Sequence, residues 1–218
     1  PTTKAMIQNN NKVMPLFIGS HNSQTIMWQS GTVDASSREG WGARMLELLN
    51  QPAQTISPNI SLDGAQLFTS TLSRPTFSIN PDVIQNLATL NPADGQENSE
   101  LDLFYSMQNI DSSVVLDREL ASRNLSTLKS FSALSETLES IQDSSVDYPD
   151  DSLIEGQLFQ RQLKMAARLI EAAPELGHQR QVLMVQMHAY DTHDNQDRIL
   201  PGLVRSLFSN LESFQRDL

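Results

Sequence analysis

The C-terminal third of the chain constrains the fold more than any other part of the sequence. Apolar residues recur at helical spacing over residues 158–173, and Pro174 and Gly177 end that helix. Residues 181–187 then have the length and the valine content of a buried strand. A polar loop at 188–197 separates the strand from a second amphipathic helix at 200–218. This order of elements predicts an α/β fold, in which helices cover a central sheet.

Three more elements are predicted before this pattern. Residues 12–18 resemble a short buried strand, although Pro15 favours an edge position or a bulge. We expect residues 13–18 and a central strand at 182–187 to lie in the same sheet. Helices are predicted at 37–50, with Ser36 or Ser37 as N-cap, and at 117–142.

Two other regions have the composition of irregular structure. Residues 51–108 are rich in Pro, Asn, Ser, Thr and Gly, and we expect an excursion with one or two short strands. Residues 143–155 are acidic, and 143–151 consist of turn-forming residues. A calcium loop of the EF-hand type fits poorly, because that pattern needs a Gly at its sixth position and a Glu at its twelfth. We therefore expect an exposed loop without a bound ion.

Composition narrows the classes of function. The 15 basic and 26 acidic residues give a net charge of −11, which argues against a nucleic-acid partner. The absence of cysteine excludes disulfides and cysteine-ligated metals. No apolar run reaches the ~18 residues of a membrane span, and no signal peptide is evident. Because the chain begins without Met and ends within a predicted helix, we expect residues 1–218 to be a single, incomplete α/β domain of a longer chain.

The loop after the 181–187 strand carries the best candidates for chemistry. If the backbone there stays extended, the side chains of Asp191 and His193 point the same way and reach a single divalent ion. Oxygen and nitrogen donors together suit Zn, Mn, Fe or Ni. The alternative is a capped loop, in which Asp194 or Asn195 caps the next helix and His193 is hydrogen-bonded to a carboxylate. Both interpretations remain open at this point.

Residues 180–196 and the helix after them resemble a bacterial family of exported proteins, domain-of-unknown-function family 1501. In that family a strand ends in Gly-Gly-aromatic-Asp-Thr-His-x-x-Gln, where this chain has His-Ala-Tyr-Asp-Thr-His-Asp-Asn-Gln over 188–196. Residues 160–170 are similar to the family's preceding helix, and residues 19–23 and 40–44 to its Ser-His and Gly-Trp-x-x-Arg segments. The resemblance covers both ends of the chain in the correct order, whereas residues 57–152 carry little of it.

The resemblance implies an alkaline-phosphatase-like sandwich, in which metal ions bind at the carboxyl ends of central strands. Asp191 and His193 fall on the metal-binding positions of that family. His188 stands where the family has Gly, and it is a further ligand or a proton donor, or else the close backbone approach that the family's glycines permit is not used here. The accessory candidates are His188, Asp194, Asn195 and His21.

The implied function is that of a fragment of a metal-dependent hydrolase, which uses a divalent ion such as Zn or Mn on a phosphate or sulfate ester. The substrate would be a small-molecule ester or a glycan-type compound, and the location periplasmic or extracellular. The alternative is an exported, non-catalytic binding or assembly protein that keeps the fold. Further family segments, which would supply more ligands and the nucleophile region, do not occur here. No motif singles out a nucleophile among Ser20, Ser23 and Thr192.

The remaining histidines and the tryptophans have simpler interpretations. His21 is expected to be a hydrogen-bonded loop residue, and His178, which follows a helix end, to be exposed. Trp28 and Trp41 are expected to anchor the core.

Overall fold

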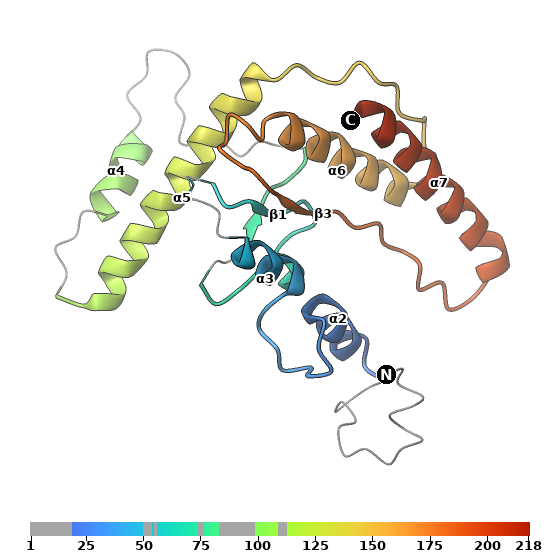
Figure 1. Ribbon diagram of the computed structural model, residues 1–218, viewed down its shortest axis with the longest axis horizontal. Helices are drawn as coiled ribbons and strands as arrows, with labels where there is room; N and C mark the ends of the chain where they lie inside the picture. The colour runs from blue at the N-terminus through green and yellow to red at the C-terminus, as the bar shows by residue number, and fades with distance from the viewer. Residues whose placement is uncertain (1–18, 50–53, 55, 74–75, 83–98, 109–112) are drawn as a thin grey trace.

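The computed structural model describes residues 19–49, 54, 56–73, 76–82, 99–108 and 113–218 (Figure 1). Within these ranges the fold is mixed α/β, with helices around a small parallel sheet. The elements in chain order are α2 (His21–Ser30), α3 (Trp41–Leu48), β1 (Asn59–Ser61), the 3-10 helix η1 (Leu67–Thr69), β2 (Phe77–Ser78), α4 (Ser99–Gln108), α5 (Val115–Ser140), α6 (Ile154–Glu171), β3 (Val182–Met184) and α7 (Gln196–Asp217).

The sheet has the strand order β2-β1-β3, and all of its described strands are parallel. Ile60 of β1 pairs with Phe77 of β2 on one side and with Leu183 of β3 on the other. Each residue of β1 is buried, as expected of a strand with a neighbour at each edge. Because the strands are parallel, the three chain segments that leave their carboxyl ends meet at one edge of the sheet.

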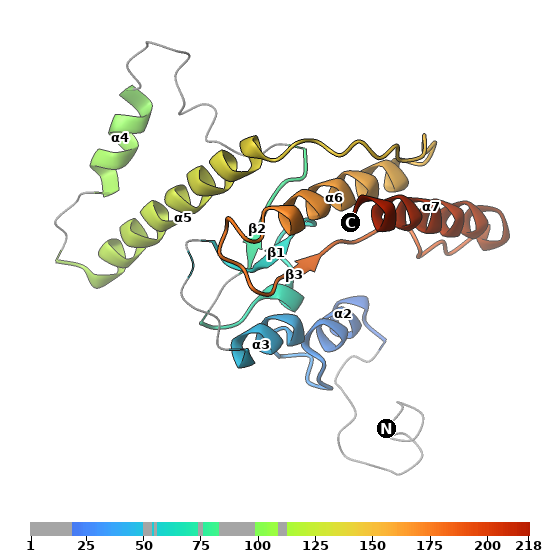
Figure 2. The ribbon, with the colours of Figure 1, turned by 45° about the horizontal axis from the view of Figure 1, so that its top comes forward.

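Helices lie on both faces of this sheet. In Figures 1 and 2, α5 and α6 lie on one side of the strands, and α2 and α3 lie on the opposite side. The core between the sheet and the first pair of helices is made of apolar side chains, which include Ile60, Leu62, Ile79, Leu134, Leu138, Met165 and Leu169. On the other side α3 buries Ala43 and Leu46 and contacts β1 and β3. Helix α7 packs along α6.

The predicted strand at 182–187 is present, but it is shorter and not central. Strand β3 ends at Met184, and among the described strands it lies at an edge of the sheet. The central strand is β1, which lies in the region 51–108 that was expected to be an irregular excursion. One or two short strands were predicted there, and β1 and β2 are two. The strand expected at 13–18 lies outside the described residues.

Three of the predicted helices are confirmed with shifted ends, since α5, α6 and α7 cover most of 117–142, 158–173 and 200–218. Helix α3 begins later than expected, with Gly40 rather than Ser36 or Ser37 at its N-cap position. Ser36 instead donates its backbone N–H and its hydroxyl to Asp34, at 2.8 and 2.7 Å. Helices α2 and α4 were not predicted, because neither has a pronounced apolar face.

The acidic loop at 143–151 is irregular, as predicted, but part of it packs against the helices. The Tyr148 hydroxyl donates to Asp217 Oδ2 at 2.9 Å, and Lys164 Nζ lies 5.0 Å from the centre of the Tyr148 ring. Asp151 accepts a hydrogen bond from the backbone N–H of Leu153 at 2.9 Å and another from Asn210 of α7 at 3.2 Å. Side chains of this loop therefore contact both α6 and α7, and the loop is not fully solvated.

Across the described helices, none combines the length and the apolar character that crossing a membrane requires.

Candidate functional site at the carboxyl edge of the sheet

A cavity of about 400 Å³ opens where the three strands end. We call it the strand-end cavity. Asp63 follows β1, Asn80 and Asp82 follow β2, His188 follows β3, and Gln162 comes from α6. Apolar side chains complete its lining, namely Leu62, Ile79, Pro81 and Leu158. Parallel α/β sheets place their ligands at this edge, because the polar loops of neighbouring strands meet there.

The central contact of this cavity joins Asp63 and His188, which are 125 residues apart in the chain. His188 Nε2 lies 3.0 Å from both carboxylate oxygens of Asp63. The Asp63 side chain is only 18% exposed, whereas that of His188 is 48% exposed. The Gln186 amide nitrogen lies 3.3 Å from His188 Nδ1, and because an amide nitrogen only donates, Nδ1 accepts and Nε2 carries the proton. The imidazole therefore donates to Asp63.

Two glutamine side chains, Gln29 and Gln66, form a chain of hydrogen bonds that ends at Asp63. Gln66 Nε2 donates to the backbone oxygen of Asp63 at 2.8 Å and to its Oδ2 at 3.1 Å. Gln29, a buried residue of α2, donates to Gln66 Oε1 at 2.7 Å and accepts from the backbone N–H of Phe68 at 3.0 Å. The carboxylate is thus oriented by hydrogen bonds that reach from α2 to the end of β1.

The chain segment that carries His188 is held by the side-chain amide of Gln162. Gln162 of α6 is buried, and its Nε2 donates to the Gln186 carbonyl at 3.0 Å. The Gln186 backbone N–H donates to Gln162 Oε1 at 2.8 Å. This reciprocal pair ties the segment after β3 to α6, so that His188 leaves the sheet in a defined direction.

Asp191 and His193 contact each other a few residues beyond β3, but the backbone is not extended as the prediction assumed, since His193 has φ at 46°. His193 Nε2 lies 2.9 Å from Asp191 Oδ2, and His21 Nδ1 lies 3.7 Å from the same oxygen. His21 is the first residue of α2 rather than a loop residue. The His193 side chain is 78% exposed, so the cluster lies at the surface. Two imidazoles from separate elements therefore converge on one carboxylate.

Asp194 and Asn195, the other two candidates in this loop, make hydrogen bonds through their backbone atoms. Asn195 occupies the N-cap position of α7 in a left-handed conformation, with φ at 55°, and its side chain makes no capping hydrogen bond. Its carbonyl accepts from the backbone N–H groups of Arg198 and Ile199, each at 3.0 Å. The backbone N–H of Asp194 donates to the Thr192 carbonyl. The structure thus shows the His193–carboxylate contact of the capped-loop interpretation without the side-chain cap.

A second cavity, of about 550 Å³, lies between α2 and the segment after β3. We call it the Trp28 cavity. Trp28, Tyr190, Phe159 and Met187 line it, together with the amide side chains of Gln24, Gln29 and Gln186. Trp28 is 58% exposed and stacks on Phe68, with ring centroids 6.0 Å apart, and Trp41 meets the same ring edge-on at 4.6 Å. Trp28 and Trp41 therefore lie at the surface, on either side of Phe68, and do not anchor the core as predicted.

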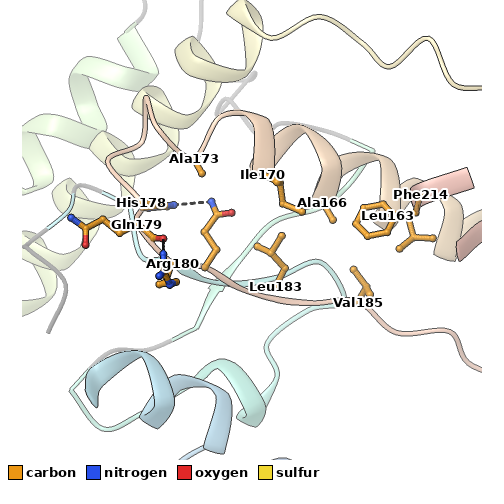
Figure 3. Close-up of a pocket in the computed structure, with 11 residues that line it drawn as sticks. Leu163, Ala166, Ile170, Ala173, His178, Gln179, Arg180, Leu183, Val185 and Phe214 are labelled. Atoms are coloured by element: carbon orange, nitrogen blue, oxygen red, sulfur yellow. Dashed lines mark hydrogen bonds between the residues drawn. The ribbon is translucent and has the colours of Figure 1, made fainter. Parts of the chain in front are cut away.

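A third cavity, of about 510 Å³, runs along β3 and α6 (Figure 3). Its walls are mainly apolar, with Leu183 and Val185 facing Ala166 and Ile170. His178 closes one end; it is buried, which corrects the prediction that it is exposed. Its Nε2 donates to the Ile56 carbonyl at 3.0 Å, and its Nδ1 accepts from Gln181 at 2.9 Å. Burial holds the pKa of His178 below its usual value. Since both nitrogens are occupied, this histidine has a structural role.

Sequence reasoning missed Asp63, Gln66, Asp82 and Gln162. Asp63 follows the apolar residues Ile60 and Leu62 and precedes Gly64, so a strand ending in Asp-Gly was a signal that could have been used. The glutamines carry no such signal, because their role depends on partners far away in the sequence.

The donor types fit a divalent transition metal only in part. Imidazole nitrogen and carboxylate oxygen suit Zn or Mn. Within the ranges that the structure describes, however, no group of three or more His, Asp or Glu side chains is arranged to hold an ion. Asp191 and His193 alone offer fewer donors than the three or four protein ligands of a zinc site.

Comparison with known proteins adds no family. No protein-family model, no curated protein and no solved structure matches the chain significantly.

Proposed function

We propose that the chain is a metal-dependent hydrolase of family 1501, with an alkaline-phosphatase-like sandwich, and that it acts on a phosphate or sulfate ester outside the cytoplasm. The observation that carries this proposal is the convergence of His193 and His21 on the carboxylate of Asp191, beyond the carboxyl end of β3. Chemistry in parallel α/β sheets lies at that edge. The sequence resemblance at residues 180–196 supports the same assignment.

In this proposal Asp191 and His193 bind the metal, and His188, His21, Asp194 and Asn195 are accessory residues. A bound metal would polarise the ester oxygens and stabilise the charge that develops during hydrolysis. The chain's own contribution would be to hold the donors together, since His193 Nε2 and His21 Nδ1 lie 2.9 and 3.7 Å from Asp191 Oδ2.

A second candidate is an exported binding or assembly protein without catalysis. The specific observation in its favour is that Asp191 and His193 contact each other on an exposed surface, which is also how a structural loop satisfies its polar side chains.

The test compares the wild-type protein with the double variant D191A/H193A by calorimetric titration with Zn²⁺ and Mn²⁺. We expect weak binding to the wild type and a loss of about tenfold or more in the variant. E136Q, on the exposed side of α5, is the control and should bind like the wild type. Hydrolysis of 4-nitrophenyl phosphate and 4-nitrophenyl sulfate is measured in the same samples.

Equal metal affinity in the wild type and the double variant would contradict the ligand assignment. A large loss of stability in the metal-free double variant would favour the structural loop, because exposed ligand residues contribute little to packing.

A further inference from the structure

The strand-end cavity combines hydrogen-bond acceptors with apolar walls. Asp63 and Asp82 offer carboxylate oxygens, and Asn80 offers an amide oxygen. Leu62, Ile79, Pro81 and Leu158 supply the apolar surface. A ring that bears several hydroxyl groups matches both features, since its O–H groups donate and its C–H faces pack on apolar side chains.

The charge of the lining selects against anions. Two carboxylates face the cavity, and its described lining contains neither lysine nor arginine. Arg161 Nε lies 2.5 Å from Asp82 Oδ1, as an ion pair without the alignment of a hydrogen bond, and so it is already engaged. A phosphate or sulfate group placed here would meet Asp63 and Asp82 at close range, which is unfavourable in a partly buried site.

The acceptors are oriented before any ligand arrives. Gln66 and His188 hold the Asp63 carboxylate from two sides, and Gln162 holds the segment that carries His188. Groups that are already ordered lose little conformational freedom on binding, so the free energy of the new hydrogen bonds is retained. This network is what an ordinary solvated acidic surface lacks.

We propose that the strand-end cavity binds a neutral polyhydroxylated ligand, a sugar or a cyclic polyol, through hydroxyl groups that donate to Asp63 and Asp82. The inference deepens the proposed function, on which it rests in one respect: the bound polyol would be the alcohol part of the ester. The anionic ester group would lie outside this cavity.

The experiment measures binding of methyl α-D-glucopyranoside and myo-inositol to the intact protein by saturation-transfer NMR and calorimetry. The expected result is millimolar binding of at least one probe, weakened about tenfold or more in D63N, since a lost hydrogen bond to a charged group has that effect. D82N is a second variant. Its side chain is half-exposed, so the substitution should leave the protein folded, and it should also weaken binding. E136Q should bind like the wild type, and inorganic phosphate, which has no polyol part, should not bind in this cavity.

Three outcomes would overturn the inference. The first is that neither polyol binds at concentrations up to about 50 mM. The second is equal binding in the wild type, D63N and D82N. The third is Ca²⁺ or Mn²⁺ binding that depends on Asp63 in the absence of polyol binding, which would assign the cavity to a cation. Polyol binding without hydrolysis of the aryl esters would contradict the proposed function alone, and hydrolysis without polyol binding would contradict the inference alone.

Discussion

At position 189 an alanine adopts a backbone conformation that favours glycine. Its φ is 69°, in the left-handed region, and it lies between His188, which turns toward Asp63, and Tyr190, which lines the Trp28 cavity. A residue with a Cβ therefore occupies a left-handed backbone position in the loop that carries His188.

Ala189→Gly should therefore stabilise the protein. A left-handed conformation costs a non-glycine residue roughly 1–2 kcal/mol, and glycine loses about 0.5–1 kcal/mol more backbone entropy on folding. We expect the free energy of unfolding to rise by about 0.5–1 kcal/mol in urea denaturation. Ala121→Gly, in α5, is the control and should lower it by about 1 kcal/mol. If both Ala189→Gly and Ala121→Gly lowered the free energy of unfolding, residue 189 would not require a left-handed backbone.

His178 predicts a pH dependence of stability. Burial lowers its pKa in the folded protein, although the hydrogen bond to the Ile56 carbonyl opposes the shift. Below its usual value of about 6.5, the unfolded chain therefore takes up a proton that the folded protein does not. The stabilising contribution is complete above that pH and is lost as the pH falls toward the lowered value.

We expect the free energy of unfolding to decrease between about pH 7 and pH 5.5, and H178Q to have a shallower decrease. Chemical denaturation at several pH values measures both slopes. Q179A, at the exposed neighbouring position, changes no titratable group and should keep the wild-type slope. If H178Q and the wild type had the same slope, His178 would not be the titrating group.

At the scale of elements, α6 and α7 are joined through Asp151, which precedes α6. Its carboxylate accepts hydrogen bonds from Ser206 and Asn210 on α7. Gly156, in the first turn of α6, lies against this contact, so that a Cβ there would overlap the Asp151 carboxylate and the Ser206 hydroxyl. The glycine is thus explained by close packing between two helices.

Gly156→Ala should lower the free energy of unfolding by about 1–3 kcal/mol, although alanine is the better helix former, because the hydrogen bonds of Asp151 are disrupted. Gly202→Ala is a matched control in α7, where a Cβ would meet only Leu153 at 3.7 Å, an ordinary contact distance. That substitution should stabilise by up to about 1 kcal/mol. Thermal and urea denaturation measure both, and a stabilising Gly156→Ala would contradict the close approach of Asp151.

At the scale of the whole molecule, the sheet is short and most of the core lies between it and the helices. Leu138 of α5 is fully buried against Ile60 and Leu169, whereas Leu116, on the same helix, is 74% exposed. One end of α5 therefore covers the sheet and the other extends away from it, as Figure 2 shows.

Leu138→Ala should cost about 2–5 kcal/mol of unfolding free energy, because a buried side chain is lost and a cavity remains. Leu116→Ala should stay within about 0.5 kcal/mol of the wild type. Urea denaturation of the two variants, with hydrogen exchange of the sheet amides, checks the pair. Similar losses in both would mean that α5 packs differently against the sheet.

The sequence alone determined the three C-terminal helices and the position of β3. Their patterns are local, since apolar residues at steps of three and four, or in an unbroken run, identify an element without knowledge of its neighbours. The sequence also singled out Asp191 and His193, but the left-handed backbone at His193, which turns that side chain onto Asp191, was not predicted.

Only the tertiary structure decided what depends on distant partners. Strand β1 has too few apolar residues to be recognised as central, and it becomes so because β2 and β3 pair with its two edges. The Asp63–His188 contact needs the carboxyl ends of two parallel strands at one edge, and the burial of His178 needs the carbonyl of Ile56 and the amide of Gln181. Local periodicity reports the face that a residue presents, but the partner that meets that face is set by the path of the whole chain, and here that path placed the cavity and its acceptors.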